Sequence, residues 1–399
     1  MSGQDRMPRI LFATGHLPCP PQMGAHLRVF NIAKQLRKAG SVTFVYIGKP
    51  FDPVRLKATQ QELGPVQTFV IPDRPCPSFL KSHRYRFEYH WPWYHSAKLS
   101  KTDQATFFEL CKSHDLNWFH TLNPADTAGR FSYPDAVIDL DDLNQKKFSL
   151  MLQTETQLRG KIGIQFLIYK WRRWEQIALK RFSHKVVCSP ADRVFLGNTP
   201  DIHVIPNGFE KPEITPVWKS RRQTRVGFIG QVDYMPNRRG LEWFTQTIWP
   251  IILKQQPNAR LRIAGNMTCK DRFSAVPSCD ILGFIPSTED EFATWSSMIV
   301  PLQFGGGTRL KILDAFSKKC PVISTSVGAY GLDITHGRDI LIADTAEDFA
   351  SCCIDLLDQE DFGRKIADEA WQLFEANYTW DAIGKTIQSV VQNATGGIL

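Results

Sequence analysis

Short apolar strands alternate with helical stretches along the whole chain, and this alternation limits the possible folds more than any other feature. Seven runs in the first half are short, apolar and rich in strand-forming residues: residues 9–14, 42–47, 66–72, 116–120, 136–140, 185–189 and 202–208. They are continuously apolar rather than alternately apolar and polar, which is typical of parallel strands covered on both faces. A doubly wound α/β domain is therefore predicted.

A second series of apolar runs follows in the other half of the chain. It comprises residues 225–230, 260–265, 280–284, 297–302, 321–326 and 339–343. Between the two series, residues 209–224 carry prolines and charges without apolar periodicity, which indicates a linker. We expect one domain over residues 1–208 and a second over 225–379, with a C-terminal helix at about 380–399 that packs back on the first. Doubly wound sheets bind ligands at the carboxyl ends of their strands, so two of them predict a cleft between the domains.

Composition excludes several classes of protein. A chain of 399 residues with 43% hydrophobic content can bury a large core and is not disordered. The longest apolar stretch, Ile248–Leu253, is interrupted by a proline and is far shorter than the roughly 18 residues of a membrane span. The N-terminus has no secretory apolar region, and the nine cysteines include no C-x-x-C pair. We expect a cytoplasmic protein with reduced thiols and neither a disulfide framework nor a zinc site.

Charge is distributed unevenly between the halves. Residues 1–200 carry 28 Lys plus Arg against 16 Asp plus Glu, whereas the rest of the chain has more acidic than basic residues. A basic half can face nucleic acid, anionic lipid headgroups or a phosphorylated small molecule, and charge alone does not choose among them. The segment Ser78–Lys101 combines aromatic and basic side chains, so it is either an interfacial element or an irregular loop packed on its domain.

A glycine loop provides the most informative chemistry. Three glycines at residues 305–307 follow an apolar run and precede a helix that we expect Thr308 to N-cap. Free backbone N–H groups at such a helix start bind anions, and Arg309 and Lys311 add positive charge that suits a diphosphate. The loop lacks the Gly-Lys-Ser/Thr ending of an ATP-hydrolysing P-loop, so ATP hydrolysis is not implied.

Asp314 lies two turns further along this predicted helix. At that distance from a diphosphate its carboxylate could accept hydrogen bonds from ribose hydroxyls. An ion pair with Lys311, three residues away on a solvated face, is the structural alternative. Both interpretations remain open at this point.

Residues 301–332, preceded by residues 227–265, resemble the donor domain of retaining glycosyltransferase family 4, which has the GT-B fold. The segments PCPPQMGAHLRVFNIAKQLRKAG, WFHTL, VVCSPADRVFL and IPNGFE match the same family in order, most closely the sugar transferases of bacterial exopolysaccharide systems. The resemblance implies two tandem Rossmann-like domains facing a cleft. It also implies transfer of a sugar from a nucleoside diphosphate sugar, with retention and with neither a metal nor another cofactor.

The resemblance also assigns roles to individual residues. It implies that His120 is catalytic, that Asp314 binds the donor ribose, and that Gly283 and Phe284 border the base. The diphosphate-binding residues that it implies, together with those chosen for charge, are Gly24, Gly230, Gly306, Gly307, Thr308, Arg309 and Lys311. The family's pair of glutamates, separated by seven residues, falls on Gly306 and Asp314, so the first carboxylate is missing. What holds the donor sugar's hydroxyls is left open.

Polar residues at three strand ends of the first domain have competing interpretations. His120 suits general-base or polarising work near neutral pH, although a histidine at a strand end is often structural. Asp139, Asp141 and Asp142 orient an acceptor or cap a loop, and their spacing is only a weak metal signal. Ser189 is predicted to be structural, as the N-cap of a helix.

Several alternatives share these features. A sugar-nucleotide epimerase or a phosphorylase would have the same fold, and a sugar-nucleotide-binding protein without transferase activity would explain the missing carboxylate. The expected partners are a nucleotide-sugar donor, a lipid-linked or glycan acceptor and an anionic surface on the inner face of the cytoplasmic membrane, and not nucleic acid. A small molecule or a protein is the alternative acceptor. The sequence identifies neither the sugar, the base, the acceptor nor the oligomeric state.

Overall fold

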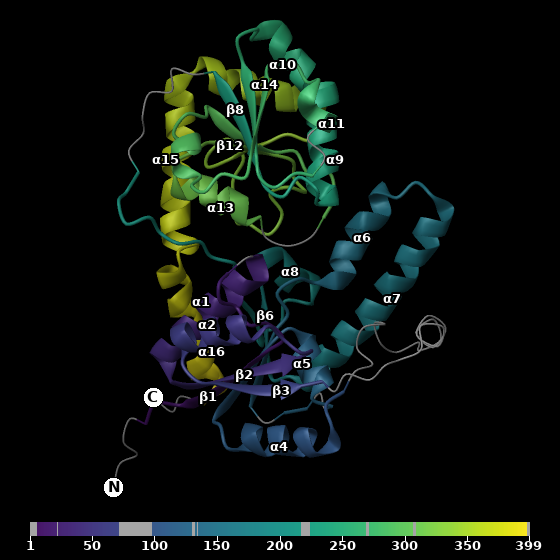
Figure 1. Ribbon diagram of the computed structural model, residues 1–399, viewed down its shortest axis with the longest axis vertical. Helices are drawn as coiled ribbons and strands as arrows, with labels where there is room; N and C mark the ends of the chain where they lie inside the picture. Colours follow the sequence, from purple (N-terminus) through teal and green to yellow (C-terminus); the bar gives the residue numbers. More distant parts are fainter. Residues whose placement is uncertain are drawn as a thin grey trace. The chain divides into compact units, whose positions relative to one another are not determined.

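The computed structural model describes residues 6–21, 23–71, 98–129, 132–133, 135–216, 224–268, 271–305 and 309–396 (Figure 1). The chain forms two compact units, the first containing residues up to Pro206 together with those from Ile383 onward, and the second running from Asn207 to Ala382. The sequence placed the boundary after residue 208, two residues later. Phe209 already belongs to the second unit, where it forms a parallel bridge to Thr379.

The first unit is built on a seven-stranded parallel sheet, counted over the described residues, in the order β3-β2-β1-β4-β5-β6-β7. The strands are β1 (Arg9–Thr14), β2 (Ser41–Gly48), β3 (Val66–Val70), β4 (Leu116–His120), β5 (Ala136–Asp139), β6 (His184–Val187) and β7 (Ile202–Val204). The order reverses between β1 and β4, and a doubly wound sheet opens a crevice for ligands at such a point.

Helices join these strands and cover the sheet. They are α1 (Gly24–Ala39), α2 (Pro53–Leu63), α4 (Lys101–Lys112), α5 (Leu122–Thr127), α6 (Asn144–Thr154), α7 (Leu158–Arg181), α8 (Pro190–Phe195) and α16 (Trp380–Ala394). In α1, Val29, Ile32 and Leu36 recur at helical spacing and are fully buried. The C-terminal helix α16 packs on α1, because a Cβ at Gly384 would collide with the side chain of Gln35.

The second unit contains a six-stranded parallel sheet, again counted over the described residues, in the order β10-β9-β8-β11-β12-β13. The strands are β8 (Arg225–Ile229), β9 (Arg260–Ala264), β10 (Cys279–Gly283), β11 (Ser297–Val300), β12 (Val322–Ser324) and β13 (Leu341–Ile342). The helices are α9 (Met235–Trp243), the π-helical turn η1 (Phe244–Ile248), α10 (Trp249–Gln255), α11 (Asp271–Ser274), α12 (Glu289–Phe292), α13 (Leu310–Ser317), α14 (Ala346–Asp358) and α15 (Glu360–Asn377).

These two parallel α/β sheets confirm the predicted fold class. Ser189 is also confirmed as an N-cap, because its hydroxyl accepts the backbone N–H of Asp192 at 3.0 Å at the start of α8. Within the described ranges, no helix is both long enough and apolar enough to cross a membrane. Most of the segment Ser78–Lys101 lies outside the described residues.

Candidate functional site

Glycines shape the carboxyl-terminal edge of the second sheet. Gly230 and Gly265 follow β8 and β9 directly, and Gly283 ends β10; their φ angles are +148°, +129° and +69°. A Cβ at Gly265 would collide with the carbonyl oxygen of Gly230, so no side chain fits there. Adjacent backbones therefore approach closely at this edge without side chains between them.

Lys311, in the first turn of α13, reaches this glycine edge. Its Nζ donates a hydrogen bond to Oδ1 of Asn237 at 3.0 Å and lies 4.2 Å from the centroid of the Phe228 ring. A Cβ at Gly230 would be 2.8 Å from the same Nζ. Burial, together with the smaller effect of the nearby Arg309 charge, lowers the pKa of Lys311 to about 7. The amine is therefore a cation that an incoming anion would stabilise.

Arg309 lies beside Lys311 at the start of α13. Its guanidinium is close to Gly305, where a Cβ would lie 2.8 Å from Nη2. The expectation that Thr308 caps this helix is wrong, because α13 begins at Leu310 and Arg309 occupies the N-cap position in a non-helical conformation, without a side-chain cap. Gly306, Gly307 and Thr308 lie outside the described residues.

Asp314 is engaged within its own unit. Both carboxylate oxygens accept from the hydroxyl of Thr288, at 3.3 and 3.4 Å, and the carboxylate forms an ion pair with Lys318 one turn later. The expected alternative partner, Lys311, bonds to Asn237 instead. Burial raises the pKa of Asp314. A ribose that used this carboxylate would compete with Thr288 and Lys318.

The two residues expected at the base lie at the end of β10. A Cβ at Gly283 would meet no atom within 4 Å, and the side chain of Phe284 is 71% exposed. An exposed aromatic ring beside an open backbone can stack on a flat heterocycle. Base binding by this pair stays a prediction.

The edge of the first sheet is filled by polar side chains rather than by glycines. Arg28 of α1 forms two parallel hydrogen bonds with Asp139 at the end of β5, at 2.8 and 3.0 Å, and both side chains are fully buried. A third bond joins Arg28 to the carbonyl oxygen of Ile205 at 3.1 Å. Asp139 is thus part of a buried ion pair, which the sequence analysis did not foresee.

His120 ends the neighbouring strand β4 and faces Asp141. Its Nε2 lies 3.8 Å from Oδ2 of Asp141, and its Nδ1 lies 3.5 Å from Oγ1 of Thr14. Burial alone would raise the pKa of Asp141, but His120 and Arg28 hold it well below its usual range. A carboxylate that stays ionised beside a buried imidazole can orient the ring.

Two further histidines join this cluster, and the sequence analysis missed both. The ring of His16 lies 5.7 Å from that of His120 and 5.6 Å from that of His26. Burial, with the two neighbouring histidines, lowers the pKa of His16 to about 4, so it is neutral at physiological pH. His16 lies two residues after the end of β1, and His120 is the last residue of β4, so their shared place near a strand end was the available signal. Gly24 is the first residue of α1 in the same unit, and its role at the diphosphate stays a prediction.

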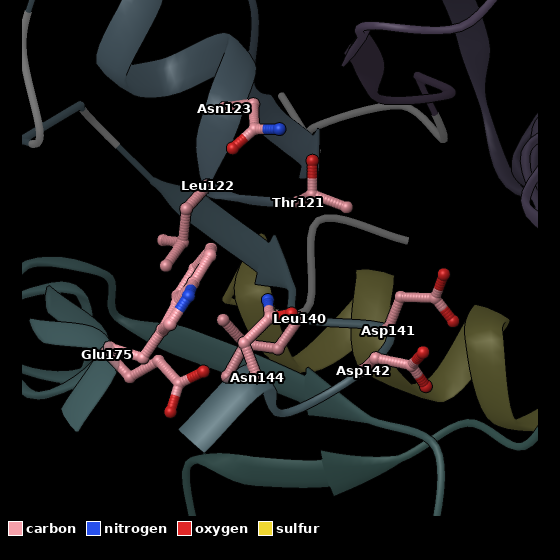
Figure 2. A pocket seen from close by; sticks show the side chains of 9 residues that line it. Thr121, Leu122, Asn123, Leu140, Asp141, Asp142, Asn144 and Glu175 are labelled. Carbon is pink, nitrogen blue, oxygen red and sulfur yellow. The ribbon is translucent and has the colours of Figure 1, made fainter. Parts of the chain in front are cut away.

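A cavity of about 250 Å³ opens next to Asp141 (Figure 2). Its lining comes from the segments after β4 and β5 and from α7: Thr121, Leu122, Asn123, Leu140, Asp141, Asp142, Asn144, Trp171 and Glu175. Glu175 is buried, and burial raises its pKa to about 8, so it is protonated at neutral pH. Among the residues that the structure describes, no group of His, Cys, Asp or Glu side chains could hold a metal ion.

Two Rossmann-like parallel-sheet domains in tandem define the GT-B fold class. In agreement, 97% of this chain superimposes on Anabaena HepE in complex with UDP and glucose, covering all of that chain with a TM-score of 0.60 and 16% identity. Sucrose-phosphate synthase from Thermosynechococcus elongatus gives a TM-score of 0.65 at 14% identity, over 97% of this chain and 99% of that one. At such identities the similarity shows the fold.

Sequence comparison adds a family for part of the second unit. Residues 223–359 match the family of group 1 glycosyl transferases, and this span contains the glycine edge, Arg309, Lys311 and Asp314. A 44.6 kDa protein in the cps region of Klebsiella pneumoniae is 31% identical over 164 residues, which are 38% of this chain and 42% of that protein. The matched span covers most of the second unit, which runs from Asn207 to Ala382.

Proposed function

We propose that the protein transfers a sugar from a nucleoside diphosphate sugar to an acceptor hydroxyl, with retention at the anomeric carbon. The observation that carries the proposal is the cationic pair Arg309 and Lys311 at a glycine-lined strand edge, within the span that matches group 1 glycosyl transferases. The UDP and glucose bound by Anabaena HepE, which shares the fold, support a nucleotide-sugar donor.

The donor phosphates bind at the glycine edge of the second unit. Because the pKa of Lys311 is about 7, an approaching diphosphate restores its proton, and the ammonium then stabilises the charge that develops on the leaving nucleotide. Arg309 adds a second, permanent cation. The proposal keeps Asp314 near the ribose and Phe284 near the base.

The acceptor reacts at the polar edge of the first unit. His120, oriented by Asp141, polarises the reacting hydroxyl or accepts its proton, and the cavity beside Asp141 offers carboxylate and amide groups to acceptor hydroxyls. These roles need no metal ion.

Surface polysaccharide assembly is the process that we infer. The relative in a cps region supports it, and the basic first half of the chain suits a lipid-linked acceptor at the inner face of the cytoplasmic membrane. Seven cysteines of the described residues are free thiols, which fits a reducing compartment. A soluble small molecule or a protein is the alternative acceptor.

Calorimetry with nucleoside diphosphates tests the donor site. Lys311→Ala and Arg309→Ala should each weaken binding by roughly 10- to 150-fold, because each removes a charge-assisted bond of about 1.5 to 3 kcal/mol. Arg364→Ala is the matched control, since Arg364 pairs with Asp361 on the exposed side of α15. Unchanged affinity in both site variants would show that the phosphates bind elsewhere.

Product analysis tests the chemistry separately. Proton coupling constants of the glycoside should show the donor's anomeric configuration, and activity should survive EDTA because two cations meet the diphosphate charge. An inverted product would rule out the retaining mechanism. Tight donor binding with neither transfer nor slow donor hydrolysis would favour a binding protein, the alternative raised by the missing carboxylate at Gly306.

A further inference from the structure

Helix α7 has an apolar side that faces away from the core of the first unit, and we call this side its outer face. Its residues recur at spacings of four, four and three, which places them on one side of the helix. They are Leu158 (73% exposed), Ile162 (63%), Phe166 (36%) and Tyr169 (52%). The opposite side packs inward through Ile164, Trp171 and Trp174, which are buried. Helix α7 is thus apolar on two sides, and only one of them contributes to the core.

Basic residues flank this outer face. The 24-residue helix contains seven Lys plus Arg and a single acidic residue, Glu175. Glu175 points inward, is 3% exposed and is protonated at neutral pH, with its pKa raised to about 8 by burial. The exposed surface of α7 therefore carries cations beside apolar groups and no carboxylate. Among these cations, Arg159, Lys161, Arg172 and Arg173 are exposed.

Helices α6 and α7 pack side by side as a hairpin in the first unit (Figure 1). Glu175 accepts the backbone N–H of Gln145 at 3.3 Å, which ties the start of α6 to α7. Trp171 and Trp174, with ring centroids 5.0 Å apart, anchor α7 in the core beneath. The outer face is presented by a packed helix rather than by a loop.

We propose that the outer face of α7 docks on an anionic lipid surface, with the helix lying in the plane of the headgroups. Apolar side chains enter the acyl boundary and the flanking cations meet lipid phosphates, the arrangement that suits an interfacial helix. A protein partner would need its own acidic rim around an apolar groove, whereas an anionic leaflet supplies both at once. This inference concerns a partner surface and stands whether or not the protein transfers a sugar.

Helix α7 lies outside the segment Ser78–Lys101, for which an interfacial role stays a prediction because most of it falls outside the described residues. Of the basic residues in Ser78–Lys101, the described Lys98 forms an ion pair with the buried Asp126 and also donates to its backbone carbonyl at 2.7 Å. Replacing Lys98 would leave the buried Asp126 without its cation, so such a variant would change the fold's own contacts as well as any lipid binding.

Sedimentation with vesicles tests the basic flank. The wild type should bind vesicles containing phosphatidylglycerol, not pure phosphatidylcholine, and should be released at about 1 M salt. Lys161→Glu, Arg172→Glu and Arg173→Glu together should lower the partition coefficient by at least about 100-fold, at about fivefold per basic residue. The control reverses the same number of exposed charges on α1, through Lys34→Glu, Arg37→Glu and Lys38→Glu, and should lose less than a tenth as much. No binding by the wild type, or equal loss in both variants, would overturn the proposal.

A second variant isolates the apolar contribution. Ile162→Ser, Phe166→Ser and Tyr169→Ser leave the charge unchanged and should weaken vesicle binding by about 10-fold or more. Unfolding temperature and nucleoside diphosphate affinity should match the wild type, which shows that the variant is folded. Unchanged vesicle binding would overturn insertion of this face. Sedimentation velocity without lipid tests whether a second copy of the chain binds this face instead. If the wild type forms an oligomer that the serine variant dissociates, while vesicle binding is unchanged, the face is a contact between copies of the chain.

Discussion

The carboxyl-terminal edges of the two sheets share one backbone architecture but differ in the side chains that occupy them. In the first unit, Arg28 forms a buried ion pair with Asp139 and lies 3.7 Å from a carboxylate oxygen of Asp141. The same Asp141 faces His120. In the second, glycines leave the strand ends bare, and Lys311 rests on an amide and an aromatic ring. The first edge is thus filled by charged side chains of opposite sign, whereas the described contacts of Lys311 at the second edge include no acidic side chain.

The two edges also differ in backbone strain. Positive φ angles at the second edge fall on glycines, which adopt them without strain. At the first edge they fall on Thr121 (φ 64°) and Asp141 (φ 52°), where a side chain is kept despite the conformational cost. Residues with side chains therefore occupy the strained positions at the first edge, whereas glycines occupy the corresponding positions at the second. The predictions below test this contrast.

The largest effect should come from breaking the buried pair of the first edge. Arg28→Met leaves Asp139 buried without its cation and should lower the free energy of unfolding by about 3 to 5 kcal/mol. Lys311→Met removes a cation that burial already disfavours and should change it by less than about 1 kcal/mol. Urea unfolding measures both values. Equal losses would show that the two edges do not differ in this way.

A double variant provides the control for the first edge. Arg28→Met with Asp139→Asn removes both charges, so it should recover much of the stability that Arg28→Met loses. No recovery would mean that the bond from Arg28 to Ile205, rather than the ion pair, carries the effect.

The second prediction tests the bare backbone of the other edge. Gly265→Ala places a Cβ against the carbonyl oxygen of Gly230 at a φ of +129°, and should destabilise the protein by about 2 to 4 kcal/mol. Gly337→Ala is the matched control: its φ is +76°, but a Cβ there would meet no atom within 4 Å. The control isolates the strain of a positive φ and should cost about 1 kcal/mol. Similar losses in both would remove the argument for close backbone approach.

These features differ in how far the sequence could predict them. The strand Leu116–His120 and the cap at Ser189 were predicted correctly, because each depends on residues within a few positions. The pair of Arg28 and Asp139 joins residues separated by 111 positions, and no local pattern relates them. Asn237 likewise reaches Lys311 only through the fold. The N-cap of α13 was misplaced because Arg309 takes a non-helical conformation that its residue type does not reveal.

The pH dependence of nucleotide affinity sharpens the comparison further. With a pKa of about 7, Lys311 is largely protonated at about pH 6 and largely neutral at about pH 8, so affinity for a nucleoside diphosphate should fall by up to about tenfold over that range. Binding near neutral pH should take up protons, measurable by calorimetry in buffers of different ionisation enthalpy. Lys311→Met should lose both effects.

The lowered pKa of Lys311 also predicts how the free energy of unfolding changes with pH. Its pKa in the folded protein lies below the ordinary value of about 10.4, so between about pH 7 and pH 10 the unfolded chain binds more protons than the folded one. The contribution of Lys311 should therefore make the wild type more stable, relative to Lys311→Met, as pH rises through this window. A difference that shrinks or stays constant would contradict a buried, destabilised ammonium.

The smallest effect concerns the strain that the first edge retains. Thr121 has φ 64° and ψ 164°, a region that is nearly restricted to glycine, and its backbone N–H donates to the carbonyl of Asp139 at 2.7 Å. Thr121→Gly relieves about 1 to 3 kcal/mol of strain but costs about 0.5 to 1 kcal/mol through the greater entropy of the unfolded chain, so a net stabilisation of about 0 to 2.5 kcal/mol is expected. Thr106→Gly, on the exposed side of α4, should instead cost about 1 kcal/mol. Since the Thr121 side chain lines the cavity beside Asp141, a variant that is more stable but less active in sugar transfer would show that the strain positions this hydroxyl for the acceptor. A variant that loses stability would show that the threonine is kept for packing.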